Sequence, residues 1–124
     1  MHYAFGNFIN DLLNNKNIQV RGDGQDIRSY LYIGDAIAWL IKLLDDPKNS
    51  IYNVGSKKEV KIENLARKIA SCKPGLEVVI EGGGKQVDNF KRPSYIPDTN
   101  KIESEYPNLI EWTELDDIIQ KMLE

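Results

Sequence analysis

The chain has one cysteine, Cys72, and one histidine, His2, among its 124 residues. A single cysteine cannot form an internal disulfide, which fits a protein of the reducing cytoplasm. One cysteine and one histidine are also too few ligands for a Cys/His zinc site. Because His2 lies next to the terminus, we assign it no role as a general base. The sequence therefore predicts a cytoplasmic protein without a resident metal.

Long apolar runs and an excess of basic residues are also missing. The longest apolar run covers residues 36–41, far short of the roughly 20 residues that cross a bilayer, and nothing resembles a signal peptide. The formal net charge is −3, whereas proteins that bind nucleic acid normally carry a basic face. We therefore expect neither a membrane nor a nucleic acid as partner. The length and the 41% of hydrophobic residues are those of one globular domain.

The glycine signatures of nucleotide-binding folds are absent as well. A Gly-x-Gly-x-x-Gly fingerprint needs a third glycine three residues after the second, but Gly22 and Gly24 are followed by Ile27 at that place. The tract at residues 82–84 continues into Lys85-Gln86 and lacks the Lys-Ser/Thr of a phosphate-binding loop. The sequence therefore gives no reason to expect a dinucleotide cofactor bound by this chain.

What is present is an alternation of helices and short strands, which predicts an α/β class. Apolar spacing, caps and stop signals predict helices over residues 5–13, 34–44, 62–71, 98–105 and 115–123. Runs of β-branched and aromatic residues predict strands over residues 18–21, 29–33, 51–54 and 76–80. Residues 81–97 predict a long loop, and loops of that length are usually functional or mobile.

Two of these helices carry further expectations. The helix over residues 34–44 is apolar on most sides, so we expect other elements to cover it. The sequence Thr113-Glu114-Leu115-Asp116 resembles a capping box, with the acidic residue shortened to aspartate. We therefore expect Thr113 to cap the terminal helix.

Four short sequence motifs occur in a characteristic order along the chain. The turn Gly22-Asp23-Gly24 precedes Arg28, and an aromatic strand then leads to Asp35. A Tyr-Asn-x-Gly element follows at residues 52–55, and an Asp-led helix begins at Asp98. In this order the chain resembles the C-terminal, substrate-binding portion of the NAD-dependent nucleotide-sugar epimerases and dehydratases, which are extended short-chain dehydrogenases/reductases. It looks most similar to dTDP/CDP-glucose 4,6-dehydratase-like proteins.

The resemblance covers the chain almost end to end and implies what is missing. It implies that residues 1–124 form a small mixed domain of helices and short strands, without the N-terminal Rossmann half that binds NAD. The catalytic Tyr-x-x-x-Lys of the superfamily is absent, because none of the six tyrosines has a lysine four positions later. The resemblance thus implies NAD in a parent enzyme, which is expected to be a homodimer, and an inactive chain when taken alone.

The resemblance assigns Arg28 and Arg92 to the diphosphate of a nucleotide-sugar. A diphosphate offers several anionic oxygens, and a guanidinium group presents a rigid fork of donors that stays charged. One arginine at a strand start and one on a facing loop could grip the diphosphate from two sides. The alternative is that both are ordinary solvated charges.

Further residues match the nucleotide site of the family. Gln19, Val20 and Arg21 match the strand segment that lies against the base through its backbone. Asn7 and Phe8, at the head of the first helix, match the neighbouring wall for base and ribose. Ordinary core and capping roles would explain these residues equally well.

Three other residues have simpler explanations than a site. Asn53 of the Tyr-Asn-x-Gly element is a candidate for substrate binding, but bracing of the turn explains it better. Asp35 fits a helix cap or a first-turn acid better than a catalytic acid. Trp39 lies in an apolar helix and is expected to pack in the core.

The function that this resemblance implies is binding. In a 4,6-dehydratase the domain would position an NDP-hexose for oxidation at C4 and loss of water, as part of polysaccharide biosynthesis. An epimerase of the same superfamily is the first alternative. A non-catalytic module, which senses a nucleotide or binds a protein, is the alternative from another class.

Overall fold

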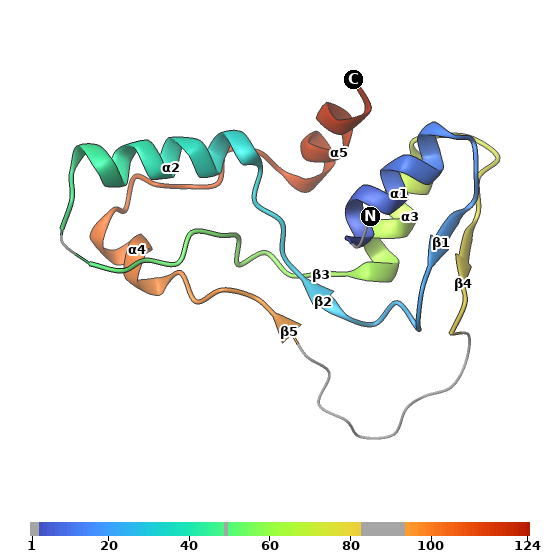
Figure 1. Cartoon of the computed structure of the whole chain (residues 1–124), viewed down its shortest axis with the longest axis horizontal. Helices are drawn as coiled ribbons and strands as arrows, with labels where there is room; N and C mark the ends of the chain where they lie inside the picture. Colours follow the sequence, from blue (N-terminus) through green and yellow to red (C-terminus); the bar gives the residue numbers. More distant parts are fainter. Residues whose placement is uncertain (1–2, 49, 83–93) are drawn as a thin grey trace.

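The computed structural model describes residues 3–48, 50–82 and 94–124. Helices and short strands alternate along the described chain, which confirms the predicted α/β class (Figure 1). The helices are α1 (Ala4–Leu13), α2 (Ile33–Asp45), α3 (Ile62–Ser71), α4 (Asn100–Glu105) and α5 (Leu115–Leu123). The strands are β1 (Ile18–Val20), β2 (Ile27–Arg28), β3 (Val60–Lys61), β4 (Val78–Ile80) and β5 (Ser94–Tyr95). None of the helices in these ranges has the length and apolar character to cross a membrane.

The larger core lies where α1, α3 and α5 meet a pair of parallel strands. β1 pairs with β4 in the register Ile18↔Val78 and Val20↔Ile80, and α1 and α3 pack against β1 and against each other. The helices form because their apolar residues recur on one side, as the sequence predicts. The core contains Phe5, Phe8, Ile9, Leu12, Ile18, Val20, Ile62, Leu65, Ala66, Ile69, Ala70, Ile118 and Ile119.

A second sheet has the order β3-β2-β5. β2 runs antiparallel to β3 and parallel to β5, so that Arg28 lies opposite Val60 on one side and Tyr95 on the other. The strand predicted over residues 29–33 is therefore wrong. Pairing stops after Arg28 because β3 begins only at Val60, and the ring of Tyr30 packs edge-on against Phe5 at 5.0 Å. The aromatic alternation reflects this packing and not a strand.

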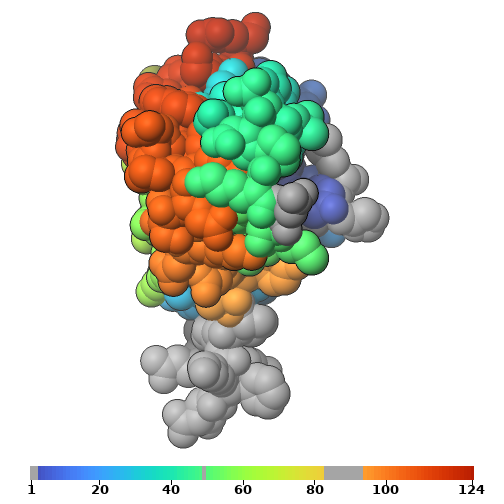
Figure 2. Space-filling view, turned by 90° about the vertical axis from the view of Figure 1, so that its left-hand side faces the viewer, coloured from blue at the N-terminus to red at the C-terminus, as the bar shows by residue number. Residues whose placement is uncertain are grey.

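A smaller core joins α2 to α4 and the segment that follows α4. Trp39 is 2% exposed, packs with Ile102, Tyr106 and Leu109, and donates its indole N–H to the carbonyl of Ile110 at 3.0 Å. The predicted core role of Trp39 is confirmed. Figure 2 shows α2 in green beside the orange segment after α4.

Three expectations about elements near this core are wrong. Residues 51–54 form no strand with any part of the chain that the structure describes, and Ile51 is 89% exposed. One side of α2 is exposed and not covered by the described elements. The N-cap position of α5 is Glu114 and no side chain caps it. The hydroxyl of Thr113 bonds Asp35 instead, at 3.1 Å.

Candidate functional site

A cleft of about 450 Å³ opens between α1 and the edge of β1 that faces away from β4. It brings together four residues that the sequence assigns to a nucleotide site, namely Asn7, Phe8, Gln19 and Arg21. The fifth, Val20, points its side chain into the core and is fully buried, so only its backbone could take part. The cleft is lined by Ala4, Asn7, Phe8, Asn10, Asp11, Gln19, Arg21, Ile62 and Glu81.

The backbone of β1 presents alternate residues to this cleft. The N–H of Ile18 donates to Glu77 at 2.9 Å and the carbonyl of Val20 accepts from Glu81 at 3.0 Å, so both residues face β4. In a parallel pair the intervening residue directs its N–H and C=O to the other edge. The N–H of Gln19 indeed donates away from β4, to Asp11 Oδ2 at 3.2 Å. The backbone of Gln19 therefore borders the cleft.

The chemistry of the cleft is mixed. Phe8 and Ile62 form its apolar floor but are buried, at 2% and 9% exposed, while Asn7 and Asn10 supply amide groups and Arg21 a positive charge. Backbone or amide groups could bond the polar edge of a flat heterocycle that lies against this floor. Asp11 was not a sequence candidate, although its place one turn after Asn7 and Phe8 on the same helix is a signal that could have found it.

Arg28 lies outside this cleft, on the central strand β2. Its Nη1 donates to the carbonyl of Ile27 at 2.8 Å, and its Nη2 pairs with Asp26 Oδ2 at 3.0 Å. The side chain is 33% exposed. Asp26, two residues away, is the partner that sequence reasoning missed.

The other predicted arginine, Arg92, lies outside the described residues. The described chain resumes at Ser94, which pairs with Ile27, and Tyr95 pairs with Arg28. The C-terminal end of the predicted loop therefore runs beside the strand that carries Arg28.

Asn53 braces the chain. Its side-chain amide donates to the backbone carbonyl of Asp98 at 2.9 Å. It also lines a separate open cavity of about 660 Å³, which Ser94 and Tyr95 of β5 border on the other side. The structure thus brings Asn53 close to β5 and not to the cleft of Asn7.

Asp35 is neither the N-cap of α2 nor an exposed acid. The N-cap position is Tyr32, so of the two places predicted for Asp35 the cap is wrong and the first turn is confirmed. The carboxylate is 5% exposed and accepts the backbone N–H groups of Trp112 and Thr113 at 3.0 and 2.9 Å. These donors satisfy the hydrogen-bonding capacity of the buried carboxylate. Asp35 therefore anchors the chain before α5.

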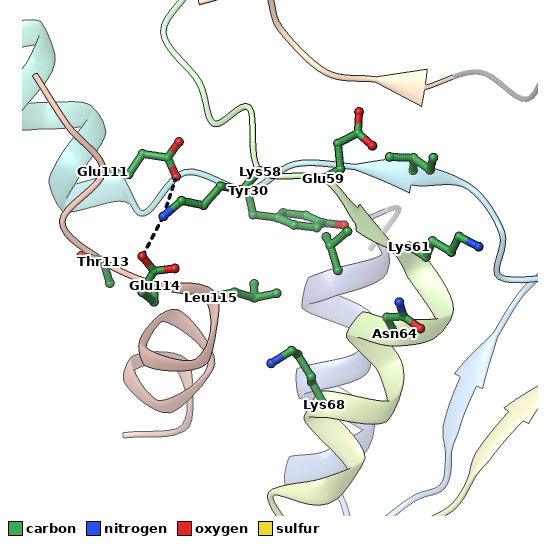
Figure 3. A pocket seen from close by; sticks show the side chains of 12 residues that line it. Tyr30, Lys58, Glu59, Lys61, Asn64, Lys68, Glu111, Thr113, Glu114 and Leu115 are labelled. Atoms are coloured by element: carbon green, nitrogen blue, oxygen red, sulfur yellow. Dashed lines mark hydrogen bonds and ion pairs between the residues drawn. The ribbon is translucent and has the colours of Figure 1, made fainter. Parts of the chain in front are cut away.

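A third cavity, of about 510 Å³, lies between α3 and α5 below Tyr30 and was not predicted (Figure 3). Lys58 pairs there with Glu114 at 2.8 Å and Glu111 at 3.7 Å, and the bond to Glu114 raises the pKa of Lys58. Burial raises the pKa of the Tyr30 hydroxyl, against the charge of Arg28. The lining contains as many glutamates as lysines, so it does not favour an anion such as a nucleotide.

The described residues contain no group of three or more His, Cys, Asp or Glu side chains placed to hold a metal ion.

Comparison with known proteins finds a family profile that matches the first part of the chain. Residues 3–55 match the profile of the NAD dependent epimerase/dehydratase family. The matched range includes seven of the nine residues that line the α1–β1 cleft, together with Arg28 and Asn53. A dTDP-D-glucose 4,6-dehydratase of Dictyostelium discoideum is 41% identical over 63 residues, which make up 50% of this chain and 14% of that protein.

Two other epimerase/dehydratase matches extend the similarity. A trifunctional UDP-glucose 4,6-dehydratase/UDP-4-keto-6-deoxy-D-glucose 3,5-epimerase/UDP-4-keto-L-rhamnose-reductase of Arabidopsis thaliana is 35% identical over 89 residues, which are 69% of this chain and 13% of that protein. The UDP-glucose 4-epimerase of Thermotoga maritima, solved with UDP-glucose, has the same fold, with a TM-score of 0.79 and 17% identity. The match covers 98% of this chain and 38% of that chain. The chain therefore spans only a minor part of the proteins it matches.

Proposed function

We propose that this chain is the C-terminal, nucleotide-sugar-binding portion of an NAD-dependent NDP-sugar 4,6-dehydratase. The observation that carries the proposal is the α1–β1 cleft, which gathers Asn7, Phe8, Gln19 and Arg21 from separate elements. Similarity to a dTDP-D-glucose 4,6-dehydratase over half of the chain supports the choice of reaction. An epimerase is the second candidate, because a UDP-glucose 4-epimerase shares the fold.

In this proposal the base lies in the cleft, against Phe8 and the backbone of Gln19. Arg28 binds the diphosphate, and Arg92 is its second ligand. The turn of residues 22–24 supports this arrangement because it joins β1, which borders the cleft, directly to β2, which carries Arg28. Binding energy from the nucleotide would then fix the orientation of the hexose for the chemical step.

The described residues do not fit NAD. A pyrophosphate cradle needs a glycine-rich turn that leads from a strand into a helix N-terminus. The turn at Gly22 and Gly24 leads into strand β2 instead. We therefore propose that NAD binds to another part of the parent enzyme, and that this chain alone performs no hydride transfer.

Calorimetric titration of the chain with dTDP-glucose and UDP-glucose tests the proposal. We expect binding, and Arg28→Ala should weaken it by about 1.5–3 kcal/mol, the range of a charge-assisted hydrogen bond. Arg67→Ala is the matched control, since Arg67 is an exposed arginine on α3 paired with Glu63 at 2.6 Å. The alternative of a non-catalytic interaction module would be favoured by either of two results. Neither nucleotide-sugar binds, or Arg28→Ala binds them with the same affinity as Arg67→Ala.

A further inference from the structure

Asp26 and Arg28 lie two residues apart where the chain enters β2, so their side chains belong to the same face. Successive side chains of a strand alternate between its two faces, which makes residues i and i+2 neighbours. Asp26 Oδ2 lies 3.0 Å from Arg28 Nη2, and Arg28 Nη1 donates to the carbonyl of Ile27 at 2.8 Å. The guanidinium group is therefore folded back along its own strand, and a carboxylate of the chain already accepts from it.

The backbone on both sides of this ion pair is held in place. The carbonyl of Asp26 accepts the N–H of Ile62, in the first turn of α3, at 3.0 Å. Two residues earlier, the carbonyl of Gly24 accepts the N–H of Glu63 at 2.8 Å. Arg28 is fixed as well, because β2 is paired with β3 on one side and with β5 on the other (Figure 1). The fold therefore keeps the carboxylate of Asp26 beside the guanidinium group.

This ion pair matters more for an anion than for the fold. The side chains of Asp26 and Arg28 are 45% and 33% exposed, and partly solvated ion pairs contribute little to stability. A phosphate group on Arg28, by contrast, would lie beside the negative charge of Asp26, and like charges a few Å apart repel each other. The carboxylate thus acts against any anion that binds to this arginine.

We propose that Asp26 is a specificity-determining residue of the diphosphate site, where its carboxylate competes with phosphate oxygens for the guanidinium group of Arg28. The inference rests on the proposed function, in which Arg28 binds the diphosphate of a nucleotide-sugar. A diphosphate must either displace Asp26 Oδ2 from Arg28 Nη2 or bind next to its charge. Both events cost free energy, and the cost is the same for every phosphate ligand, whether or not it carries a base.

Such a cost selects against anions that bind through phosphate groups alone. Inorganic phosphate and pyrophosphate have only their contacts with the phosphate site to offset it. A nucleotide-sugar also binds through its base, which the proposed function places in the α1–β1 cleft. Asp26 therefore keeps free phosphates weakly bound, while a ligand with a base retains enough affinity to occupy the site.

Titration of the chain and of Asp26→Asn with pyrophosphate, UDP-glucose and uridine tests the inference. Asparagine keeps the shape of the side chain and removes its charge. We expect the affinities for pyrophosphate and UDP-glucose to rise by the same factor, about 10-fold, because a unit charge close to the phosphates is lost. The affinity for uridine, which has no phosphate, should not change. Asp26→Glu keeps the charge and should show no such gain.

Glu59→Gln is the matched control for the loss of charge. Glu59 is exposed and precedes Val60, which lies opposite Arg28, and its side chain forms no ion pair with the described residues. The substitution removes one negative charge near β2 without altering the ion pair. It should leave all three affinities unchanged. Thermal unfolding establishes that each variant is folded, and misfolding cannot mimic a gain in affinity.

Two results would overturn the inference. Weaker or unchanged pyrophosphate binding by Asp26→Asn would show that Asp26 positions Arg28 or takes no part in binding. A gain that extends to uridine, or that Glu59→Gln shares, would trace the effect to the general charge of the chain. Failure of the proposed function is distinguishable from both, because UDP-glucose would then bind neither the chain nor Asp26→Asn.

Discussion

The carboxylate of Asp35 holds the backbone of Thr113, 78 residues later, through an N–H donor at 2.9 Å. The same oxygen accepts the N–H of Trp112 at 3.0 Å, and the second oxygen accepts the hydroxyl of Thr113. One buried side chain in the first turn of α2 thus fixes where the chain enters α5. Because α5 packs into the larger core and α2 into the smaller one, Asp35 connects the two cores.

Replacing Asp35 should therefore destabilise the whole domain. Asp35→Asn keeps the size of the side chain, and its oxygen can still accept both backbone N–H groups, but the charge-assisted hydrogen bonds become neutral ones and the Thr113 hydroxyl must accept instead of donate. We expect the free energy of unfolding to fall by about 1.5–3 kcal/mol, measured by urea denaturation. Glu77→Gln, at an exposed position, is the control and should change it by less than about 0.5 kcal/mol. A loss no larger than that of the control would contradict the anchoring role.

The two glycines of the turn between β1 and β2 allow the strain of a positive φ to be measured separately from a steric clash. Gly22 and Gly24 both have positive φ, of 81° and 72°. A Cβ atom on Gly22 would meet nothing within 4 Å, whereas one on Gly24 would lie 3.0 Å from Glu63 Cβ. Gly22→Ala should cost about 1–2 kcal/mol of unfolding free energy through φ alone. Gly24→Ala should cost about 1 kcal/mol more because of the clash, as thermal and urea unfolding would show. Equal losses would mean that the Glu63 contact relaxes freely.

Low pH should reduce the stability of the smaller core, because Glu103 on α4 becomes protonated. The bond from Lys57 Nζ at 2.6 Å and the hydroxyl of Thr99 lower the pKa of Glu103 below its ordinary value of 4.5. A carboxyl group with a lowered folded-state pKa stabilises the fold above its unfolded pKa and loses that contribution as the pH falls through its folded pKa. Glu103→Gln should therefore melt below the parent chain at pH 7, and this difference should shrink below about pH 4.5. A difference that stays constant from pH 7 to pH 3 would argue against the lowered pKa.

From its place in the cleft, we expect Asn7 to contribute to binding of the base of a nucleotide and not to binding of its phosphates. Among the described residues the amide of Asn7 forms no hydrogen bond, so its removal should leave stability unchanged. Asn7→Ala should weaken UDP binding by about 0.5–1.5 kcal/mol, the value of one neutral hydrogen bond. Binding of inorganic pyrophosphate should not change. Titration with both ligands checks this, and an equal loss for the two would place Asn7 at the phosphates.

Strong periodicity made the helices of the larger core predictable. The prediction of residues 62–71 coincides with α3, and α1 and α5 follow their apolar stripes closely. The strands β1 and β4 were found because β-branched residues mark them, although β4 begins only at Val78. In the candidate site, Asn7, Phe8, Gln19 and Arg21 could be named from the sequence. The acids Asp11 and Asp26 were missed, although Asp11 lies one turn after Asn7 and Asp26 lies two residues before Arg28. What the sequence could not show is that Asp11 accepts the backbone N–H of Gln19 from another element.

The failures concern residues whose state depends on distant parts of the chain. Tyr30 and Tyr32 have the alternation of a strand, but the antiparallel partner β3 begins only at Val60, which lies opposite Arg28, so no residue of β3 lies opposite the two tyrosines. β3 and β5 have two residues each, too few for a pattern to show. Thr113 lies in the local sequence of a helix cap, yet its hydroxyl donates to the buried carboxylate of Asp35 on α2 instead of capping α5. Local sequence cannot show such competition.

The parallel pairing of β1 with β4 also affects how this chain folds. Ile18 and Val78 lie 60 residues apart, which is nearly half of the chain. Closing a loop of that length costs entropy before any contact repays it. The contact of α1 with α3 closes a loop of similar length, so we infer that it forms together with the alignment of Ile18 and Val78, in one slow step.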